Sequence, residues 1–246
     1  LGASSLQFNT TGASNSALGH NALRSNTTGG CNAAFGQAAL CSNTTGQQNT
    51  ALGRNAMCSN STGSYNAAVG QGSLASNTTG AENNAFGWGA MGVNTTGAAN
   101  TASGHYALFT NSTGCRNTAH GWKSLYSNTT GSCNTAVGRD ALGSNTVGTN
   151  NVGIGYQAAH LNTVASNNVA VGLTALYYNR TGTRNTAIGT YAAHKTCNIN
   201  DITAIGYSAA FCNTTGTGNT VLGSNSLYAN TTGASNSALG HNALRC

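Results

Sequence analysis

The stretch NTTGASNSALGHNALR, Asn9–Arg24, decides the fold, because the same residues return at Asn230–Arg245. The two copies lie 221 positions apart, which is thirteen steps of 17 residues. Between them the chain repeats degenerate versions of this phrase, and one glycine recurs at every step without an insertion, from Gly2 to Gly240. A fixed period of this length is typical of a solenoid in which each repeat forms one coil.

The repeat reads N-T-A-φ-G-x-x-A-L-x-S-N-T-T-G-x-x, where φ is apolar. Asn, Thr, Gly and Ser oppose helix formation. N-T-T-G predicts a turn in which the glycine supplies a positive φ angle. Two short strands per coil then remain, around T-A-φ-G and A-L-x-S. The sequence therefore predicts an all-β fold over residues 1–246, a single parallel β-solenoid or β-roll of about 14 coils with no separate globular domain.

The chain begins and stops inside a repeat and has no initiator Met. We therefore expect it to be a segment of a longer array.

Positions that recur every 17 residues form columns, named here by their first member in the opening phrase. Two columns carry large residues, and we expect them to form the core because protein interiors are close-packed. The Leu18 column comprises Leu18, Phe35, Leu52, Val69, Phe86, Ser103, His120, Val137, Ile154, Val171, Ile188, Ile205, Leu222 and Leu239. The Leu23 column comprises Leu23, Leu40, Met57, Leu74, Met91, Leu108, Leu125, Leu142, Ala159, Leu176, Ala193, Ala210, Leu227 and Leu244.

The Ala17 and Ala22 columns stay small, and we expect them on the face opposite this core, at a tight corner or against another subunit. His120 beside Ser103 would then be a local packing defect inside the core.

A third column, the Asn15 column, predicts a ladder of side-chain amides that stabilises stacked parallel strands. Its members are Asn15, Asn32, Asn49, Asn66, Asn83, Asn100, Asn117, Asn134, Asn151, Asn168 and Asn185. Ile202 interrupts this ladder within the most divergent repeat, TCNINDITAIG.

The composition offers few side chains for catalysis or metal binding. The only acids are Glu82, Asp140 and Asp201, and no two share a repeat, whereas carboxylate-based hydrolysis needs a close pair. We therefore expect no enzyme, no metal site and no cofactor. The net charge of +6 comes from scattered Lys and Arg, which disfavours nucleic acid. No apolar run approaches the roughly 18 residues of a membrane span, so we expect no membrane insertion.

Eleven asparagines begin N-x-S/T in one column, the Asn9 column. In a secreted eukaryotic protein they would be glycosylation acceptors facing solvent. The alternative is that N-T-T-G is only the turn, as Asn145-Thr146-Val147 suggests by losing the sequon. The acceptor candidates are Asn9, Asn26, Asn43, Asn60, Asn77, Asn94, Asn111, Asn128, Asn179, Asn213 and Asn230.

The cysteines favour an oxidising compartment. Cys41 and Cys58 share a column on neighbouring coils, about 4.8 Å apart, which suits a disulfide. Two further pairs fall on adjacent coils: Cys115 with Cys133, and Cys197 with Cys212. Cys31 and Cys246 remain, either as free thiols or partners of residues elsewhere, or as an intermolecular disulfide between successive rods.

Trp88, His105 and Trp122 share one variable column, the His20 column. They are candidate glycan contacts, although exposed aromatic residues also simply cover a solenoid face. Ice binding by threonine ladders is a weaker alternative, because Trp, Arg and Tyr interrupt the outward columns.

Two divergent repeats, Asn151–Gly155 and Asn168–Gly172, resemble the repeats of trimeric autotransporter adhesin heads. The commoner phrase, as in Asn185–Thr190, is similar to repeats of tail-fibre-like proteins of phages, bacteria and large viruses. The resemblance implies a parallel β-roll, often trimeric, on a surface fibre or adhesin. The 17-residue period departs from the shorter repeat of the adhesin heads.

These observations predict an extracellular structural protein, on a cell or virion surface, whose coils assemble head-to-tail into a filament or surface fibre. Its partner would be further copies of itself, in a trimeric or multi-stranded arrangement. The alternative is the shaft or head of a receptor-binding or glycan-binding adhesin or tail fibre.

Overall fold

The computed structural model describes residues 2–246 and contains no helix among them. Parallel strands of three residues, one in each 17-residue coil, form a β-solenoid, as predicted. The strands are β1 Ser16–Leu18, β2 Ala33–Phe35, β3 Thr50–Leu52, β4 Ala67–Val69, β5 Asn84–Phe86, β6 Thr101–Ser103, β7 Thr118–His120, β8 Thr135–Val137, β9 Val152–Ile154, β10 Val169–Val171, β11 Thr186–Ile188, β12 Thr203–Ile205, β13 Thr220–Leu222 and β14 Ser237–Leu239.

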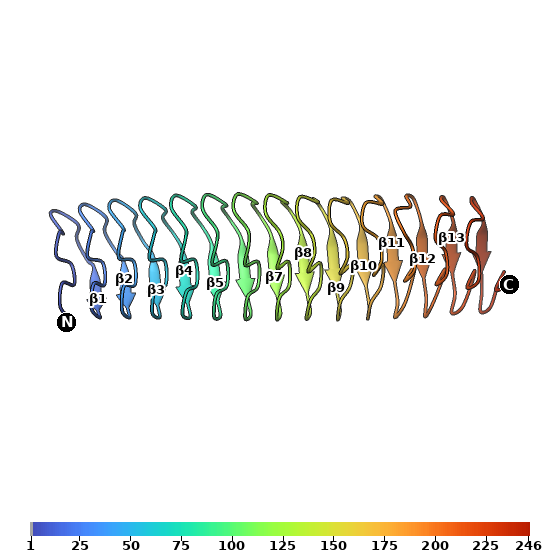
Figure 1. The fold of residues 1–246 in the computed structure, drawn as a ribbon, viewed down its shortest axis with the longest axis horizontal. Helices are drawn as coiled ribbons and strands as arrows, with labels where there is room; N and C mark the ends of the chain where they lie inside the picture. The colour runs from blue at the N-terminus through green and yellow to red at the C-terminus, as the bar shows by residue number, and fades with distance from the viewer. Residues whose placement is uncertain (1) are drawn as a thin grey trace. The chain divides into compact units, whose positions relative to one another are not determined.

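The chain divides into two compact units, one of Leu1–Lys123 with Asn128–Thr130 and one of Ser124–Ser127 with Gly131–Cys246. Strands β1–β7 belong to the first unit and β8–β14 to the second, and in each unit they pair in chain order (Figure 1). The register is constant: Ala17 pairs with Ala34 in the first unit, and Ala187 with Ala204 in the second. Every coil therefore places equivalent residues on top of one another.

Each coil holds one strand, so the second predicted strand, around A-L-x-S, is absent from the described coils. Backbone hydrogen bonds still join this segment to the next coil, as from Leu23 N–H to the Ala39 carbonyl at 3.0 Å. The backbone is nevertheless not extended, because residues of the Leu23 column have positive φ angles, 49° at Leu23 itself. Left-handed residues turn the chain here and end any strand.

The core differs from the prediction in three columns, because the Ala17 and Ala22 columns, which were expected on the face opposite the core, lie inside it, and the Leu18 column lies outside it. In every strand only the middle residue, the Ala17 column, is buried, and its two neighbours point outward because side chains alternate along a strand. The Leu18 column therefore lies on the outer face, and the expectation that it forms the core is wrong. The Leu23 and Ala22 columns are buried as far as Leu227 and Ser226. A coil of 17 residues encloses room for one large side chain, so the residue facing Leu23 across the coil is alanine.

Because the Leu18 column points outward, its two polar residues His120 and Ser103 lie outside the core. His120, at the end of β7, is exposed, and Ser103, at the end of β6, is half-buried. They occupy surface positions, so the predicted packing defect inside the core does not exist.

Two glycine columns are required by close approach between coils. Gly19 has a φ angle of 140°, and a Cβ there would strike the carbonyl of Gly36 on the next coil. Gly12, in the N-T-T-G turn, has no positive φ angle, contrary to the prediction. A side chain at Gly12 would instead strike the carbonyl of Gly29 and the amide of Asn26, so the turn glycine leaves space for a buried asparagine.

Candidate functional site

The outer face of the strands carries a row of exposed apolar side chains in each unit. It consists of the Leu18 column together with the Ser16 column, which is mostly Thr, Ser, Ala and Val, and we call it the strand face. Several of its large side chains are exposed to solvent, including Leu52, Phe86 and Ile188. No Lys, Arg, Asp or Glu occupies either column. Trp, Arg and Tyr interrupt other outward columns, as expected, and Trp88, Trp122 and Tyr156 are exposed there.

The Asn9 column is buried, so the expectation that it faces solvent is wrong. Asn26, Asn43, Asn60, Asn77, Asn94, Asn111, Asn128, Asn179 and Asn213 have no exposed surface. From Asn26 to Asn128 the column forms a ladder in which Nδ2 of each amide donates to Oδ1 of the asparagine one coil earlier, as from Asn43 to Asn26 at 2.7 Å. The same Nδ2 donates to the carbonyl of the turn glycine, Gly46, at 2.9 Å. In the second unit the ladder is interrupted, because Asn179 donates to Gly182 instead and Oδ1 of Asn162 is buried without a partner among the described residues.

This geometry opposes glycosylation. A glycan would replace a hydrogen of Nδ2, and both hydrogens are engaged inside the coil. Only Asn9 and Asn230 among the sequons are half-buried rather than enclosed. The buried amides and their turn account for the regular spacing of the sequons, in agreement with the alternative that N-T-T-G is only the turn.

The predicted Asn15 ladder is present in both units. Oδ1 of each asparagine accepts the backbone N–H of the equivalent residue in the next coil, as from Asn32 to Asn15 at 2.9 Å and from Asn185 to Asn168 at 3.0 Å. Ile202 keeps this bond through its backbone N–H, which donates to Asn185 at 3.1 Å. Its buried side chain has no amide oxygen, so it cannot accept the corresponding bond from the next coil. The divergent repeat therefore interrupts the side-chain ladder and leaves the backbone register intact.

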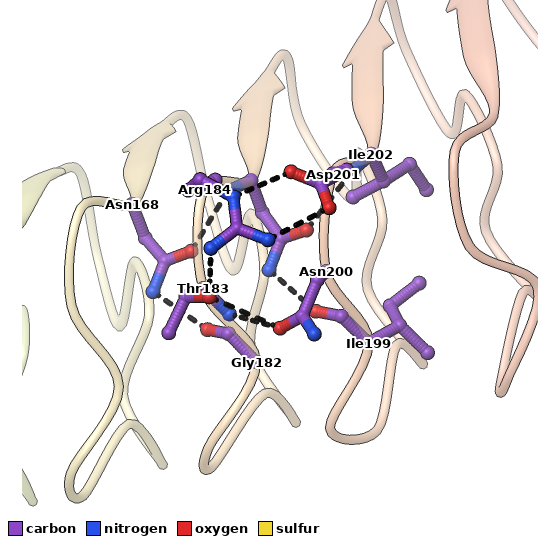
Figure 2. Close-up of polar contacts among 9 residues, drawn as sticks. Asn168, Gly182, Thr183, Arg184, Ile199, Asn200, Asp201 and Ile202 are labelled. Carbon is purple, nitrogen blue, oxygen red and sulfur yellow. Dashed lines mark hydrogen bonds and ion pairs between the residues drawn. The ribbon is translucent and has the colours of Figure 1, made fainter.

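The same divergent repeat carries an ion pair between adjacent coils (Figure 2). Arg184 Nε and a terminal guanidinium nitrogen donate to the two carboxylate oxygens of Asp201 at 2.7 and 2.9 Å. The guanidinium lowers the pKa of the Asp201 carboxyl below its ordinary value of 3.8, chiefly through these hydrogen bonds. Beside the pair, Asn200 accepts the backbone N–H of Thr183 at 2.7 Å. Both charged groups are exposed, so the pair is a surface link and lacks the burial of a catalytic dyad.

All eight cysteines hold free thiols, so none of the three predicted intramolecular disulfides is formed in the structure. Cys41 and Cys58 do meet on successive coils, and their thiols share a hydrogen bond. Burial, and then the neighbouring Cys41, raise the pKa of the Cys58 thiol above its ordinary 9.0.

The remaining cysteines are less closely associated. Cys115 and Cys133 fall in different units, and no bond joins Cys197 to Cys212. Cys31 and Cys246 are exposed, and an intermolecular disulfide between them stays a prediction.

The candidate aromatic residues gather with two that the sequence reading missed. Trp88 and His105 stack on successive coils with ring centroids 4.7 Å apart and planes at 14°. Tyr106 packs edge-on against Trp88 at 4.5 Å and against Phe109 at 4.7 Å. Trp122 is exposed beneath the ammonium group of Lys123, 4.5 Å from its ring. Tyr106 and Phe109 belong to two other columns, and only the coil geometry brings them beside Trp88.

These aromatic residues border a hollow of about 350 Å³ in the first unit. It is lined by Asn55, Gln71, Gly72, Ala75, Ser76, Trp88, Gly89, Gly92, Val93, Tyr106 and Phe109. No charged side chain lines it.

A second aromatic ladder runs through the second unit, in the column that follows Leu23. It stacks His160, Tyr177, His194, Phe211 and Tyr228 on five successive coils, with centroid separations between 5.2 and 5.5 Å. Nδ1 of His160 and of His194 each lies 3.0 Å from a backbone carbonyl of the preceding coil, which fixes the ring orientation. This column varies too much in sequence to have been predicted as a stack.

Within residues 2–246 no three His, Cys, Asp or Glu side chains converge in a way that could hold a metal ion. None of the described segments is a helix long and apolar enough to cross a membrane. Comparison with protein-family models, with curated proteins and with solved structures finds no match.

Proposed function

We propose that the protein is an extracellular structural element whose coils stack head-to-tail into a filament or surface fibre. The observation that carries this proposal is the sameness of the coil-to-coil contacts. In the first unit the Asn9 ladder repeats its amide bond at 2.7–2.8 Å from Asn26 to Asn128. Any two coils of this kind could therefore form the same contacts with one another.

The repeated phrase gives this argument a direct comparison. Leu23, in the first copy, is covered by the next coil and is 0% exposed, whereas Leu244, the same residue in the second copy, is 55% exposed. A further coil stacked on the second copy would bury Leu244 and stabilise the joint by about 1.5–3 kcal/mol for this side chain. The reasoning is the same whether that coil belongs to the same chain or to another copy.

The strand face supports lateral association of such stacks into a trimeric or multi-stranded fibre. In the second unit all seven members of the Leu18 column are apolar. Each has a threonine, valine or serine beside it in the Ser16 column, so the seven form one continuous row with no charged residue. Large exposed apolar patches usually mark interaction sites. The resemblance to surface-fibre repeats favours a place outside the cell or on a virion.

The shaft or head of a glycan-binding adhesin is the second candidate. It is favoured by the hollow beside Trp88, because a purely structural coil has no need of an aromatic-lined recess at one level. The two roles are compatible on one fibre.

Electron microscopy combined with light scattering over a range of concentrations tests the fibre proposal. We expect thin unbranched fibres that lengthen with concentration. Leu244→Asp should prevent stacking, whereas His241→Asp, at an exposed position of the same coil, should not. Ile188→Asp should leave single fibres but abolish their lateral bundles. Wild-type protein that stays at the mass of one chain at every concentration would overturn the proposal.

A further inference from the structure

We propose that the hollow bounded by Trp88, Tyr106 and Phe109 is a binding site for a neutral saccharide, with one pyranose ring seated against the indole. This inference is independent of fibre assembly, since every lining residue belongs to the first unit and none is part of the strand face.

The hollow opens over Gly72, which has no side chain, whereas the ring of Tyr106 covers Gly89 on the next coil. Gly72 and Gly89 occupy the position held by Asn21, Ala38 and Asn55 on earlier coils, with the same left-handed backbone. A Cβ at Gly72 would meet no atom within 4 Å, so the space above it is open. A Cβ at Gly89 would lie 2.8 Å from the ring of Tyr106, which leans over this glycine.

The far wall is aromatic. The ring of Phe109 leans over Gly92, where a Cβ would lie 2.7 Å away. Trp88 is 42% exposed; His105 stacks on one of its faces and is not among the lining residues, so the other face borders the hollow. A flat, rigid apolar surface of this kind accepts the C–H face of a sugar ring.

The polar groups around this wall suit hydroxyl groups. Asn55, Gln71 and Ser76 line the hollow, and their side chains make no hydrogen bond to any other described group. Between them they offer amide donors, carbonyl acceptors and a hydroxyl, the set that hydroxyl-rich ligands need. The lack of charged lining residues disfavours phosphates, sialic acids and nucleotides. The volume of about 350 Å³ lies at the small end of ligand pockets, which suits one or two sugar rings.

The test uses saturation-transfer NMR on the full chain with a panel of methyl pyranosides of glucose, galactose, mannose and N-acetylglucosamine. We expect transfer to the ring protons of at least one glycoside, unchanged by added salt. Gly72→Asn fills the open space with the residue that this column carries at Asn55, and it should weaken binding at least tenfold. Trp88→Ala should do the same.

Gly218→Asn is the matched control, because Gly218 in the second unit also has a left-handed backbone, in a column that carries asparagine at Asn150 and Asn167. It should bind like the wild type. All variants should form fibres as the wild type does, so loss of sugar binding and loss of assembly are separate results. Absence of transfer to every glycoside, equal binding by Gly72→Asn, or loss of fibres in Gly72→Asn without any sugar binding would each overturn the saccharide site.

Discussion

Asn94 donates a hydrogen bond from Nδ2 to Oδ1 of Asn77, one coil earlier, at 2.7 Å, and both side chains are completely buried. The same Nδ2 donates to Gly97, and Oδ1 of Asn94 accepts from Asn111. One asparagine thus holds three bonds that link three successive coils.

Asn94→Ala should therefore destabilise the chain by about 2–4 kcal/mol, since it leaves buried partners unsatisfied. Urea denaturation followed by circular dichroism measures this change. Asn84→Ala, on the exposed start of β5, is the control and should cost less than about 0.5 kcal/mol. Similar losses at both positions would contradict the structural role of the ladder.

The buried ladder also predicts the mass of the native protein. Because the sequon amides are enclosed and bonded, folded protein should have the intact mass of the bare polypeptide, apart from an occasional glycan at Asn9 or Asn230. Mass spectrometry before and after glycosidase treatment checks this. Glycans found by peptide mapping at Asn43 or Asn60 in folded material would show that the coil does not enclose this column.

Two adjacent residues of β11 provide a sharp test of which side of the strand faces the core. Ala187→Asp would place a charge in the closed interior and should cost several kcal/mol or prevent folding. Ile188→Asp, one residue later and 38% exposed, should change stability by less than about 1 kcal/mol. Thermal melts of the two variants measure this difference. A larger loss of stability in Ile188→Asp than in Ala187→Asp would show that the Leu18 column belongs to the core.

The Arg184–Asp201 pair predicts a pH dependence of known sign. The pKa of Asp201 is lowered in the folded chain, so the stabilisation is present above its ordinary value of 3.8 and is lost as the pH falls through the lowered value. Asp201→Asn should melt slightly below the wild type near neutral pH, and the difference should vanish at about pH 2. The effect is small because both groups are exposed. A difference that persists in strong acid would assign it to a cause other than the ion pair.

The period and the Asn15 ladder could be predicted from sequence because both depend only on which residues recur at 17-residue steps. The direction of side chains could not. Ala17 and Leu18 are both apolar, and the usual preference for large residues inside favours Leu18. Yet Leu23 already fills the narrow coil, so the smaller neighbour turns inward. The Asn9 column was misread because turn asparagines usually face water, whereas here Gly12 lets the amide fold under the turn.

The candidate sugar site was only partly visible in sequence. Trp88 and His105 share a column and could be paired by counting. Tyr106 and Phe109 come from other columns. They lie beside Trp88 because residues of this segment have left-handed backbone angles, which no local sequence motif predicts. The hollow itself depends on the missing side chain at Gly72, and a search of the sequence for functional side chains does not find such a position.

The amide ladder of the Asn9 column also has a direction along the chain. In each described link Nδ2 of the later asparagine donates the hydrogen bond and Oδ1 of the earlier one accepts it, so these amide dipoles point the same way along a unit. A stack built on such links has two chemically different ends, one offering an oxygen and the other an N–H. Two stacks that met with the same ends would face donor against donor or acceptor against acceptor. Coils that are joined through such links must therefore all have the same orientation along the stack.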